Sequence, residues 1–100
     1  MDADGYPTEE ELEKIRTWSH PKYDYTGLLD YVGSHWWYPE YFHKEPTKAG
    51  AQYKISTGGW SGNEELIGAL QENLVFWGLC WVSSRRGGHY EFETRKLADD

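Results

Sequence analysis

The sequence predicts an α+β fold: a small, mostly antiparallel sheet of about four strands with helices on one face, in the order α-α-β-β-α-β-β. Two kinds of pattern support this prediction. Capping-box signatures precede apolar residues at helical spacing, first at Thr8 and again at Ser61. Alternating apolar and polar residues indicate half-buried strands at 52–56 and 89–93.

Two helices are expected in the first third of the chain. Thr8 and Glu11 form a T-x-x-E capping box, and Pro21 marks the end of the helix that follows. The apolar face of this helix consists of Leu12, Ile15 and Trp18. A second helix is expected over Tyr25–His35, with an apolar side made of Leu28, Leu29, Val32 and Trp36. The chain is expected to form one domain, 1–100, with a frayed tail over 1–7.

The middle of the chain predicts two strands joined by a loop. The segment 36–42 is aromatic and extended, and its proline cannot donate to a ladder, so an edge strand or an irregular entry to one is expected there. Residues 45–50 should form a loop. The alternation in 52–56 predicts a half-buried strand with Tyr53 and Ile55 inward.

A third helix and an apolar segment follow. Ser61 and Glu64 form the second capping box, and we expect their helix to be lined by Leu66, Ile67, Leu70 and Leu74. The segment 75–82 is apolar almost throughout, which favours a central strand covered on both faces, with Trp77 and Trp81 in the core. A hairpin turn at 85–88 then leads into a last strand with one wet face.

The formal charge is −7, and it is unevenly distributed along the chain. Eight acidic residues lie at the two ends: Asp2, Asp4, Glu9, Glu10, Glu11, Glu13, Asp99 and Asp100. Residues 14–98 hold all ten Lys and Arg against nine acids, so the body of the chain is nearly neutral. Because duplex nucleic acid is bound through a basic stripe, we expect no such partner, whereas a small anion remains compatible with this charge distribution.

Other features limit the chemistry and the compartment. Cys80 is the single cysteine and lies in an apolar run, so we expect a buried, reduced and inert thiol. The N-terminus lacks the apolar region of a signal peptide, and the stretch 74–82 is too short to span a bilayer. The four histidines lack the spacing of zinc ligands. We therefore expect a cytoplasmic protein with no metal, no cofactor and no membrane partner, while a homo-oligomer stays open.

A glycine-rich turn containing Gly58, Gly59, Trp60, Ser61 and Asn63 connects a predicted strand to a predicted helix. Free N–H groups and the dipole at a helix N-terminus attract anions, so these five residues are candidate ligand contacts. The alternative is that the capping box satisfies those N–H groups and places a carboxylate where the anion would sit. The P-loop pattern G-x-x-x-x-G-K-[ST] is absent, which excludes a P-loop NTPase.

The same turn resembles the nucleophile elbow G-x-S-x-G of hydrolases, with Ser61 in the nucleophile position. It departs from that motif at Asn63, where the motif has glycine, and the chain is short for the hydrolase fold. His89 or His43 would have to act as the base. We therefore expect no enzymatic activity and keep a small hydrolase as the third hypothesis.

Arg85, Arg86 and His89 cluster at the predicted hairpin turn. Guanidinium groups bind phosphate or carboxylate in bidentate geometry, so these residues are further candidate ligand contacts. The alternative is a solvated hairpin tip. Trp60 and Trp37 are expected to be exposed, and an exposed indole stacks on a base or fills a partner's pocket. The alternative for Trp60 is that its ring covers the core.

Two stretches carry a family resemblance: Ile55–Glu64, with the sequence ISTGGWSGNE, and Trp81–Tyr90, which ends in RRGGHY. With the Phe76-Trp77 pair, they resemble small proteins encoded by bacteriophages, notably phages of actinobacteria. The resemblance covers about the last two thirds of the chain and its acidic opening, and it implies no particular functional residue. Because small phage accessory proteins are often inhibitors, it implies binding of a host defence protein or sequestration of a nucleotide immune signal in the host cytoplasm.

The leading hypothesis is a non-enzymatic phage accessory protein that binds an anionic, nucleotide-like ligand through Gly58–Asn63, Arg85 and Arg86, with Trp60 and Trp37 stacking on its base. The alternative is an inhibitor or accessory factor that binds a host or phage protein through an aromatic and acidic surface. A ligand site requires both arginines to face the glycine-rich turn across a concave pocket. A protein-binding role requires a flat aromatic patch, and hydrolysis requires a histidine within hydrogen-bond reach of the turn serine.

Overall fold

The computed structural model describes residues 5–95, and within them the chain forms four helices and a four-stranded sheet. The helices are α1 (Glu9–Arg16), α2 (Thr26–Ser34), α3 (Ser61–Glu72) and α4 (Leu74–Cys80). The strands are β1 (Phe42–Pro46), β2 (Gly50–Ser56), β3 (Trp81–Arg85) and β4 (His89–Arg95), and a 3₁₀ turn, η1 (Pro39–Tyr41), precedes β1. The predicted α+β class and element order are confirmed, with α4 as an addition between α3 and β3.

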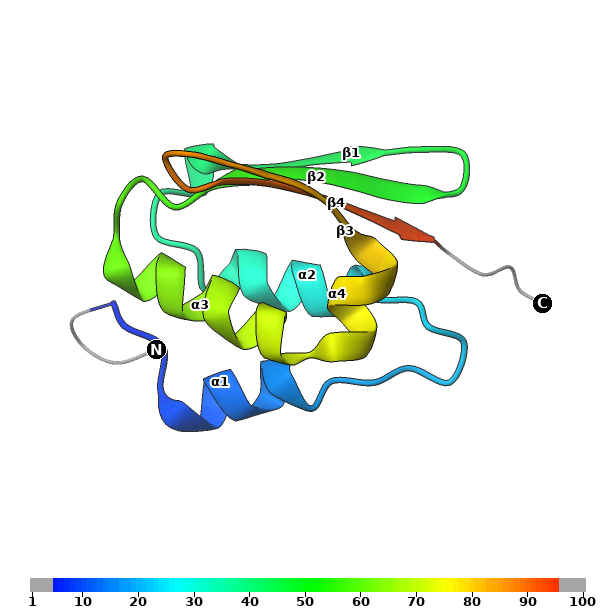
Figure 1. The fold of residues 1–100 in the computed structure, drawn as a ribbon, viewed down its shortest axis with the longest axis horizontal. Coiled ribbons are helices and arrows are strands. Elements are labelled where there is room, and N and C mark those ends of the chain that lie inside the picture. The colour runs from blue at the N-terminus through cyan, green and yellow to red at the C-terminus, as the bar shows by residue number, and fades with distance from the viewer. Residues whose placement is uncertain (1–4, 96–100) are drawn as a thin grey trace.

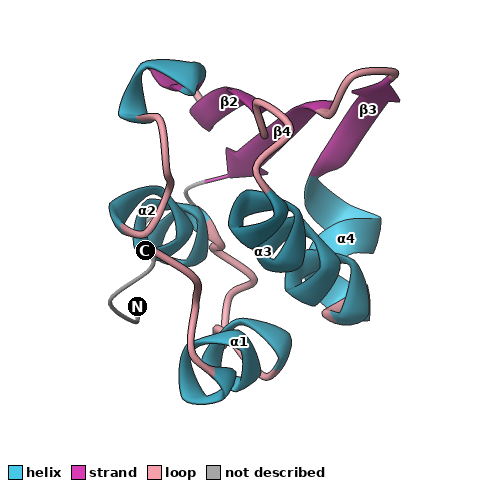
Figure 2. Cartoon of the chain, turned by 90° about the vertical axis from the view of Figure 1, so that its left-hand side faces the viewer, coloured by secondary structure: helices cyan, strands magenta, loops and turns pink. Residues whose placement is uncertain are grey.

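The elements stack in three layers (Figure 1). The sheet is one outer layer, α2, α3 and α4 lie against one of its faces, and α1 packs below them against α3 (Figure 2). The strand order is β1-β2-β4-β3, and every neighbouring pair is antiparallel. Within residues 5–95 no helix covers the other face of the sheet, so the outward side chains of all four strands share one open surface.

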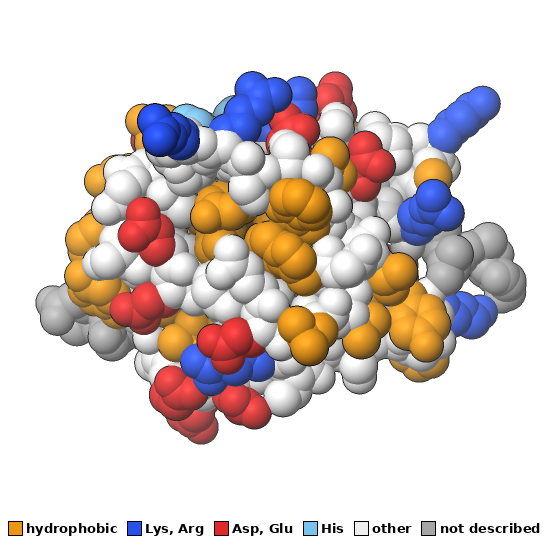
Figure 3. Space-filling model, in the orientation of Figure 1, with side chains coloured by type: hydrophobic (Ala, Val, Ile, Leu, Met, Phe, Trp, Pro, Cys, Tyr) orange, Lys and Arg blue, Asp and Glu red, His pale blue; other side chains and the backbone are white. Residues whose placement is uncertain are grey.

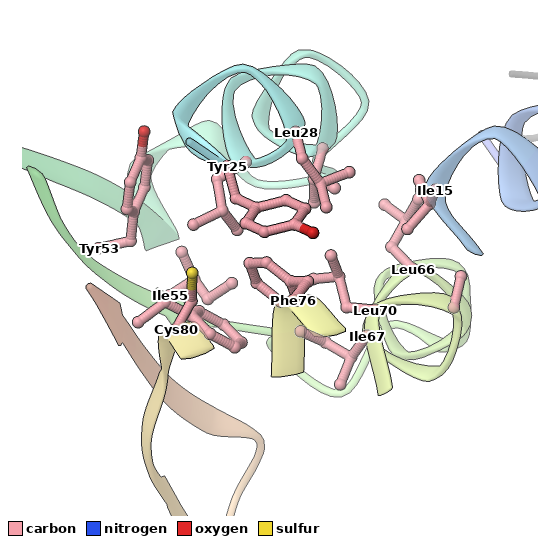
Figure 4. Packing of buried hydrophobic residues seen from close by; sticks show 14 of the residues in the cluster. Ile15, Tyr25, Leu28, Tyr53, Ile55, Leu66, Ile67, Leu70, Phe76 and Cys80 are labelled. Carbon is pink, nitrogen blue, oxygen red and sulfur yellow. The ribbon is translucent and has the colours of Figure 1, made fainter. Parts of the chain in front are cut away.

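The hydrophobic core lies between the sheet and the helices (Figure 4). Tyr25, which precedes α2, meets Phe76 of α4 edge to face at 5.6 Å between ring centroids, and Phe76 lies 5.4 Å from Phe92 of β4. Tyr53 and Ile55 point inward from β2 and are buried, as the alternation predicts. These rings therefore join elements that are far apart in the sequence.

The predicted start of α1 is confirmed. The Thr8 hydroxyl accepts a hydrogen bond from the Glu11 N–H (3.1 Å), and the Glu11 carboxylate accepts one from the Thr8 N–H (2.8 Å). This is the reciprocal arrangement of a capping box, and it satisfies N–H groups that have no partner within the helix. Leu12 and Ile15 are buried, and Trp18 packs against the core from its edge.

The segment before α1 is packed, which differs from the expected frayed tail. Gly5 and Pro7 are buried, and the Tyr6 ring lies 4.9 Å from that of Trp60. Gly5 has a φ of +86° and lies so close to the ring of Trp37 that a Cβ would meet it at 2.6 Å. Residues 1–4 of the expected tail lie outside the described residues.

The largest error of the sequence prediction concerns 75–82, which does not form a central strand. Residues up to Cys80 belong to α4, and β3 begins only at Trp81 and is an edge strand. The cause is Asn73, whose side chain accepts the Phe76 N–H (3.2 Å) and so begins a new helix. Its amide N–H₂ also donates to backbone carbonyls at the end of α1, those of Ile15 and Trp18 (both 2.9 Å).

The two tryptophans of this segment follow the corrected structure. Trp77 of α4 is half-buried against the core, and Trp81 stacks on it at 6.1 Å but remains exposed, so the expectation of two core tryptophans is wrong for Trp81. Leu74, expected to line the helix before it, instead starts α4 and is 78% exposed.

The boundaries at 36–50 also differ from the prediction. Trp36 is buried and donates its indole N–H to the Ser56 carbonyl (3.0 Å), and η1 then turns the chain before β1 begins at Phe42. The edge strand therefore starts where the prediction ended it and extends through Pro46 into the expected loop. Pro39, the proline of the predicted edge strand, instead begins η1, whereas Pro46 of the expected loop lies in β1, an edge strand of the sheet, where proline is tolerated.

Candidate ligand-binding site

The glycine-rich turn begins with two residues in the left-handed region, Gly58 (φ +63°) and Gly59 (φ +77°). A Cβ on Gly58 would meet the Tyr38 ring at 2.9 Å and the Tyr41 ring at 3.2 Å, so this position has neither the conformation nor the room for a side chain. The turn closes with a hydrogen bond from the Trp60 N–H to the Thr57 carbonyl (3.1 Å).

The second predicted capping box is wrong. Trp60 occupies the N-cap of α3 and Ser61 is the first helical residue. The Ser61 hydroxyl is hydrogen-bonded to the Tyr6 hydroxyl (3.0 Å), and the Glu64 carboxylate accepts from the Thr57 hydroxyl (3.5 Å). The carboxylate of the first helical turn therefore lies beside the turn, where it would oppose an anion at this N-terminus.

Asn63, expected to contact a ligand, is 1% exposed and acts inside the fold. Its side-chain oxygen accepts the Trp37 N–H (2.9 Å), and its N–H₂ donates to the carbonyls of Trp37 (2.8 Å) and Thr57 (3.1 Å). The amide thus joins the start of the glycine-rich turn to the backbone of Trp37, and the ligand hypothesis loses this contact.

Five rings form an aromatic row along this end of the molecule: Tyr6, Trp60, Trp37, Tyr38 and Tyr41. Trp60 is half-buried between Tyr6 (4.9 Å) and Trp37 (5.4 Å), and its indole N–H is buried without a hydrogen-bond partner among the described residues. Trp37 is 41% exposed, and Tyr38 and Tyr41 are exposed as well. The rings available to a partner are therefore these three rather than Trp60.

The predicted hairpin turn docks directly on the glycine-rich turn. The Thr57 N–H donates to the Gly88 carbonyl (3.0 Å), and a Cβ on Gly88 would overlap the Thr57 hydroxyl. Gly88 also has a positive φ of +79°. Figure 1 shows this β3–β4 turn at the same end of the sheet as η1. The two motifs that the sequence singled out separately are therefore neighbours.

Beside this hairpin, the outward side chains of the four paired strands surround a depression of ≈ 320 Å³ on the open face of the sheet, here called the open-face hollow. Its polar lining consists of His43, Lys54, Ser56, Ser83, Arg85, His89 and Glu91. Ser56 and His89 are paired across β2 and β4, and a hydrogen bond joins Ser56 Oγ to His89 Nδ1 (2.6 Å). The Ser83 hydroxyl is buried and has no hydrogen-bond partner among residues 5–95.

The open-face hollow has a local charge opposite to that of the whole chain. Arg85 and Lys54 contribute two positive charges against one negative charge from Glu91, whereas the chain carries −7. His43 and His89 add positive charge when protonated. The hollow therefore combines cations with hydroxyl donors, which is the chemistry that binds phosphate and carboxylate groups.

The structure divides the expected ligand residues into groups. Arg85 and His89 line the open-face hollow, and Arg86 is exposed at the tip of the hairpin, outside the lining residues. The glycine-rich turn borders the hollow through Ser56 and Thr57 rather than facing it across a pocket. Hydrolysis required a histidine at Ser61, but His89 is hydrogen-bonded to Ser56 instead.

Sequence reasoning did not assign five of the polar lining residues to a ligand site: His43, Lys54, Ser56, Ser83 and Glu91. The sequence did indicate which way these side chains point. In β2, Lys54 and Ser56 alternate with the inward Tyr53 and Ile55, so they face the open side of the sheet. That pattern gives the face of each strand but not which strands are neighbours.

The single cysteine matches its prediction. Cys80 is buried at the end of α4, and burial raises the pKa of its thiol to about 11, with a smaller contribution from the charge of Asp24. A thiol with so high a pKa is almost entirely protonated at neutral pH and is a poor nucleophile.

The chain matches no protein-family model, no curated protein sequence and no solved structure. In the part of the chain that the structure describes, no cluster of three or more His, Cys, Asp or Glu side chains could hold a metal ion. None of the helices formed by these residues has the length and apolar composition needed to cross a membrane.

Proposed function

We propose that this protein binds a small anionic ligand carrying a phosphate group in the open-face hollow and holds it without chemical change. The observation that supports this function is the docking of the β3–β4 turn on Thr57, which brings Arg85 and His89 beside Lys54 and Ser56. Separately, these residues are ordinary surface groups. Together they surround a depression with hydrogen-bond donors and a net positive charge.

Each group has a role that follows from its chemistry. The Arg85 guanidinium offers two parallel N–H donors to two phosphate oxygens, and the Lys54 ammonium supplies a compact positive charge. Glu91 opposes the anion, because its carboxylate lies in the same lining.

An aromatic group on the ligand has a place to stack. Tyr41 precedes His43 by two residues, and its ring lies against Gly58, two residues beyond Ser56. A ring attached to the bound phosphate would stack on Tyr41 or Tyr38, in the segment that leads into β1, whose His43 lines the hollow. This supports a nucleotide-like ligand and assigns the stacking to the tyrosines, because Trp60 is already flanked by two rings.

The test is isothermal titration calorimetry with inorganic phosphate and with linear and cyclic nucleotides. Arg85→Ala should weaken binding by about 1.5–3 kcal/mol, because a charge-assisted hydrogen bond is lost. Arg86→Ala is the matched control on the same hairpin and should change the affinity little, while Glu91→Gln should increase it. Chromatography of the ligand after incubation should recover it unchanged.

Two results would contradict this function. One is the absence of binding by every anion in the panel. The other is an equal loss of affinity in Arg85→Ala and Arg86→Ala, which would indicate general attraction by exposed cations rather than a site in the hollow.

A second candidate function, inhibition of another protein through the aromatic row, is supported by a different observation. Tyr38 is a non-glycine residue with a φ of +72°, a conformation that costs energy and that concentrates at functional sites. With Trp37 and Tyr41 it presents exposed aromatic side chains of the kind that dominate protein interfaces. Native mass spectrometry of the protein from its producing cells distinguishes the two functions by a retained small anion or a retained protein.

A further inference from the structure

The longest apolar stretch of the chain leaves a large part of its side chains uncovered. Five hydrophobic residues of α4 and β3 are exposed: Leu74, Val75, Leu79, Trp81 and Val82. Leu79 is 60% exposed, although its neighbours Phe76 and Cys80 are buried. Val75, Gly78 and Leu79 follow helical i, i+3, i+4 spacing, so they share one side of α4. We call these exposed residues with Gly78 the α4 surface.

A depression of ≈ 710 Å³ opens beside the exposed Leu79 and is here called the α4 hollow. Gly78 and Leu79 form part of its wall, and Ala49 and Ala51 line the opposite side from the β1–β2 turn and β2. A Cβ built on Gly78 would meet nothing within 4 Å. Small residues therefore form part of its lining, and the Leu79 side chain in its wall is exposed.

Charge distinguishes this surface from the rest of the molecule. The segment 73–84 contains no charged residue, although the chain carries −7. In Figure 3 hydrophobic side chains gather over α4, while carboxylates gather over α1 at the lower edge. A second copy of this acidic chain could therefore approach the α4 surface without placing carboxylates against carboxylates.

The rim of the α4 hollow also carries charges of both signs. Glu93 and Arg95 line it two residues apart at the end of β4, beyond the last residue that β4 pairs with β3. A contact with two-fold symmetry forms each pair of interactions twice. Glu93 of one copy can therefore face Arg95 of the other, while Arg95 of the first copy faces Glu93 of the second. Opposite charges and a protrusion beside a depression both make this face complementary to itself.

We propose that the α4 surface is the interface of a symmetric homodimer, in which Leu79 of each copy enters the α4 hollow of the other. The interface lies at α4 and the end of β4, away from the lining of the open-face hollow, so this inference does not depend on the proposed ligand. Association would remove Leu74 and Leu79 from water, and apolar burial is the main driving force of such interfaces.

The experiment is sedimentation velocity across a concentration series, with circular dichroism as a check on folding. The wild-type chain should approach twice its mass of 11.7 kDa as its concentration rises. Leu79→Glu should raise the dimer dissociation constant by roughly tenfold or more, because it places a charge at the centre of the contact. Leu79 is exposed in the single chain, so this variant should fold.

Gly78→Leu distinguishes a specific interface from nonspecific hydrophobic association. It adds hydrophobic surface but fills the α4 hollow, so our proposal predicts weaker association, whereas nonspecific hydrophobic contact predicts stronger association. Gly68→Leu is the matched control, since its Cβ also meets nothing within 4 Å and it lies in α3. A wild-type chain that stays monomeric throughout the series, or a Gly78→Leu variant that associates as well as Gly68→Leu, would overturn the proposal.

Discussion

Replacement of Gly88 by alanine tests the contact on which the candidate site depends. Gly88 lies in the β3–β4 turn with a φ of +79°, and a Cβ there would overlap the Thr57 hydroxyl. Gly59 provides the matched control, because its φ of +77° is nearly the same but a Cβ there would meet nothing within 4 Å. Alanine at either position carries the same backbone strain, and only Gly88→Ala adds the collision.

The expected magnitudes follow from these two differences. An L-residue held in the left-handed conformation costs about 1–2 kcal/mol, which is the full expectation for Gly59→Ala. Gly88→Ala must in addition displace the buried Thr57 side chain, which accepts the Gly59 N–H (3.3 Å) and donates to Glu64 (3.5 Å). Loss of these two hydrogen bonds adds about 0.5–1.5 kcal/mol each, so the total is about 2–5 kcal/mol.

Urea denaturation followed by tryptophan fluorescence measures both variants, and thermal melts provide a second readout. For a chain of this length each kcal/mol corresponds to a fall of about 4–8 °C in Tm. Phosphate binding should also weaken more in Gly88→Ala, because the collision moves the hairpin that carries Arg85. Equal free energies of unfolding for the two variants would refute the docking contact as the structural basis of the site.

Three further predictions concern the rest of the fold. Thr8→Ala should lower the free energy of unfolding by about 0.5–2 kcal/mol, because α1 loses its N-terminal cap. Ser61→Ala should have little effect, because Ser61 does not cap α3. Urea denaturation of the two variants measures this difference. Cys80 should react slowly with a thiol reagent near neutral pH and quickly in urea, and a fast native reaction would contradict its burial. Burial, the hydrogen bond donated to Asp30 (2.9 Å) and the Asp30 charge raise the pKa of Tyr53. Because the pKa of Tyr53 is higher in the folded chain, its contribution to the free energy of unfolding is complete below the unfolded-state pKa, about 10, and falls as the pH rises above that value. Thermal melts across alkaline pH should therefore show a shallower loss of stability in Tyr53→Phe than in the wild-type chain.

Interactions between near neighbours in the chain made several features predictable. The capping box at Thr8 spans three residues, and the inward positions of Tyr53 and Ile55 follow from strand alternation alone. The hairpin turn at 85–88 was visible because positive φ angles call for glycine, and Gly87 and Gly88 both have them. From such local patterns the α+β class and the element order could be read correctly, and so could two lining residues of the open-face hollow, Arg85 and His89.

Tertiary contacts decided the remainder. Trp77 and Trp81 share a side in a strand as well as in a helix, so their spacing could not distinguish the two; the hydrogen bonds of Asn73 to the end of α1 did. Asn63 likewise acts on Trp37, far away in the sequence, which is why its role was misassigned. The open-face hollow itself depends on the strand order β1-β2-β4-β3, because only neighbouring strands bring their outward side chains together, and no local pattern encodes which strands are neighbours.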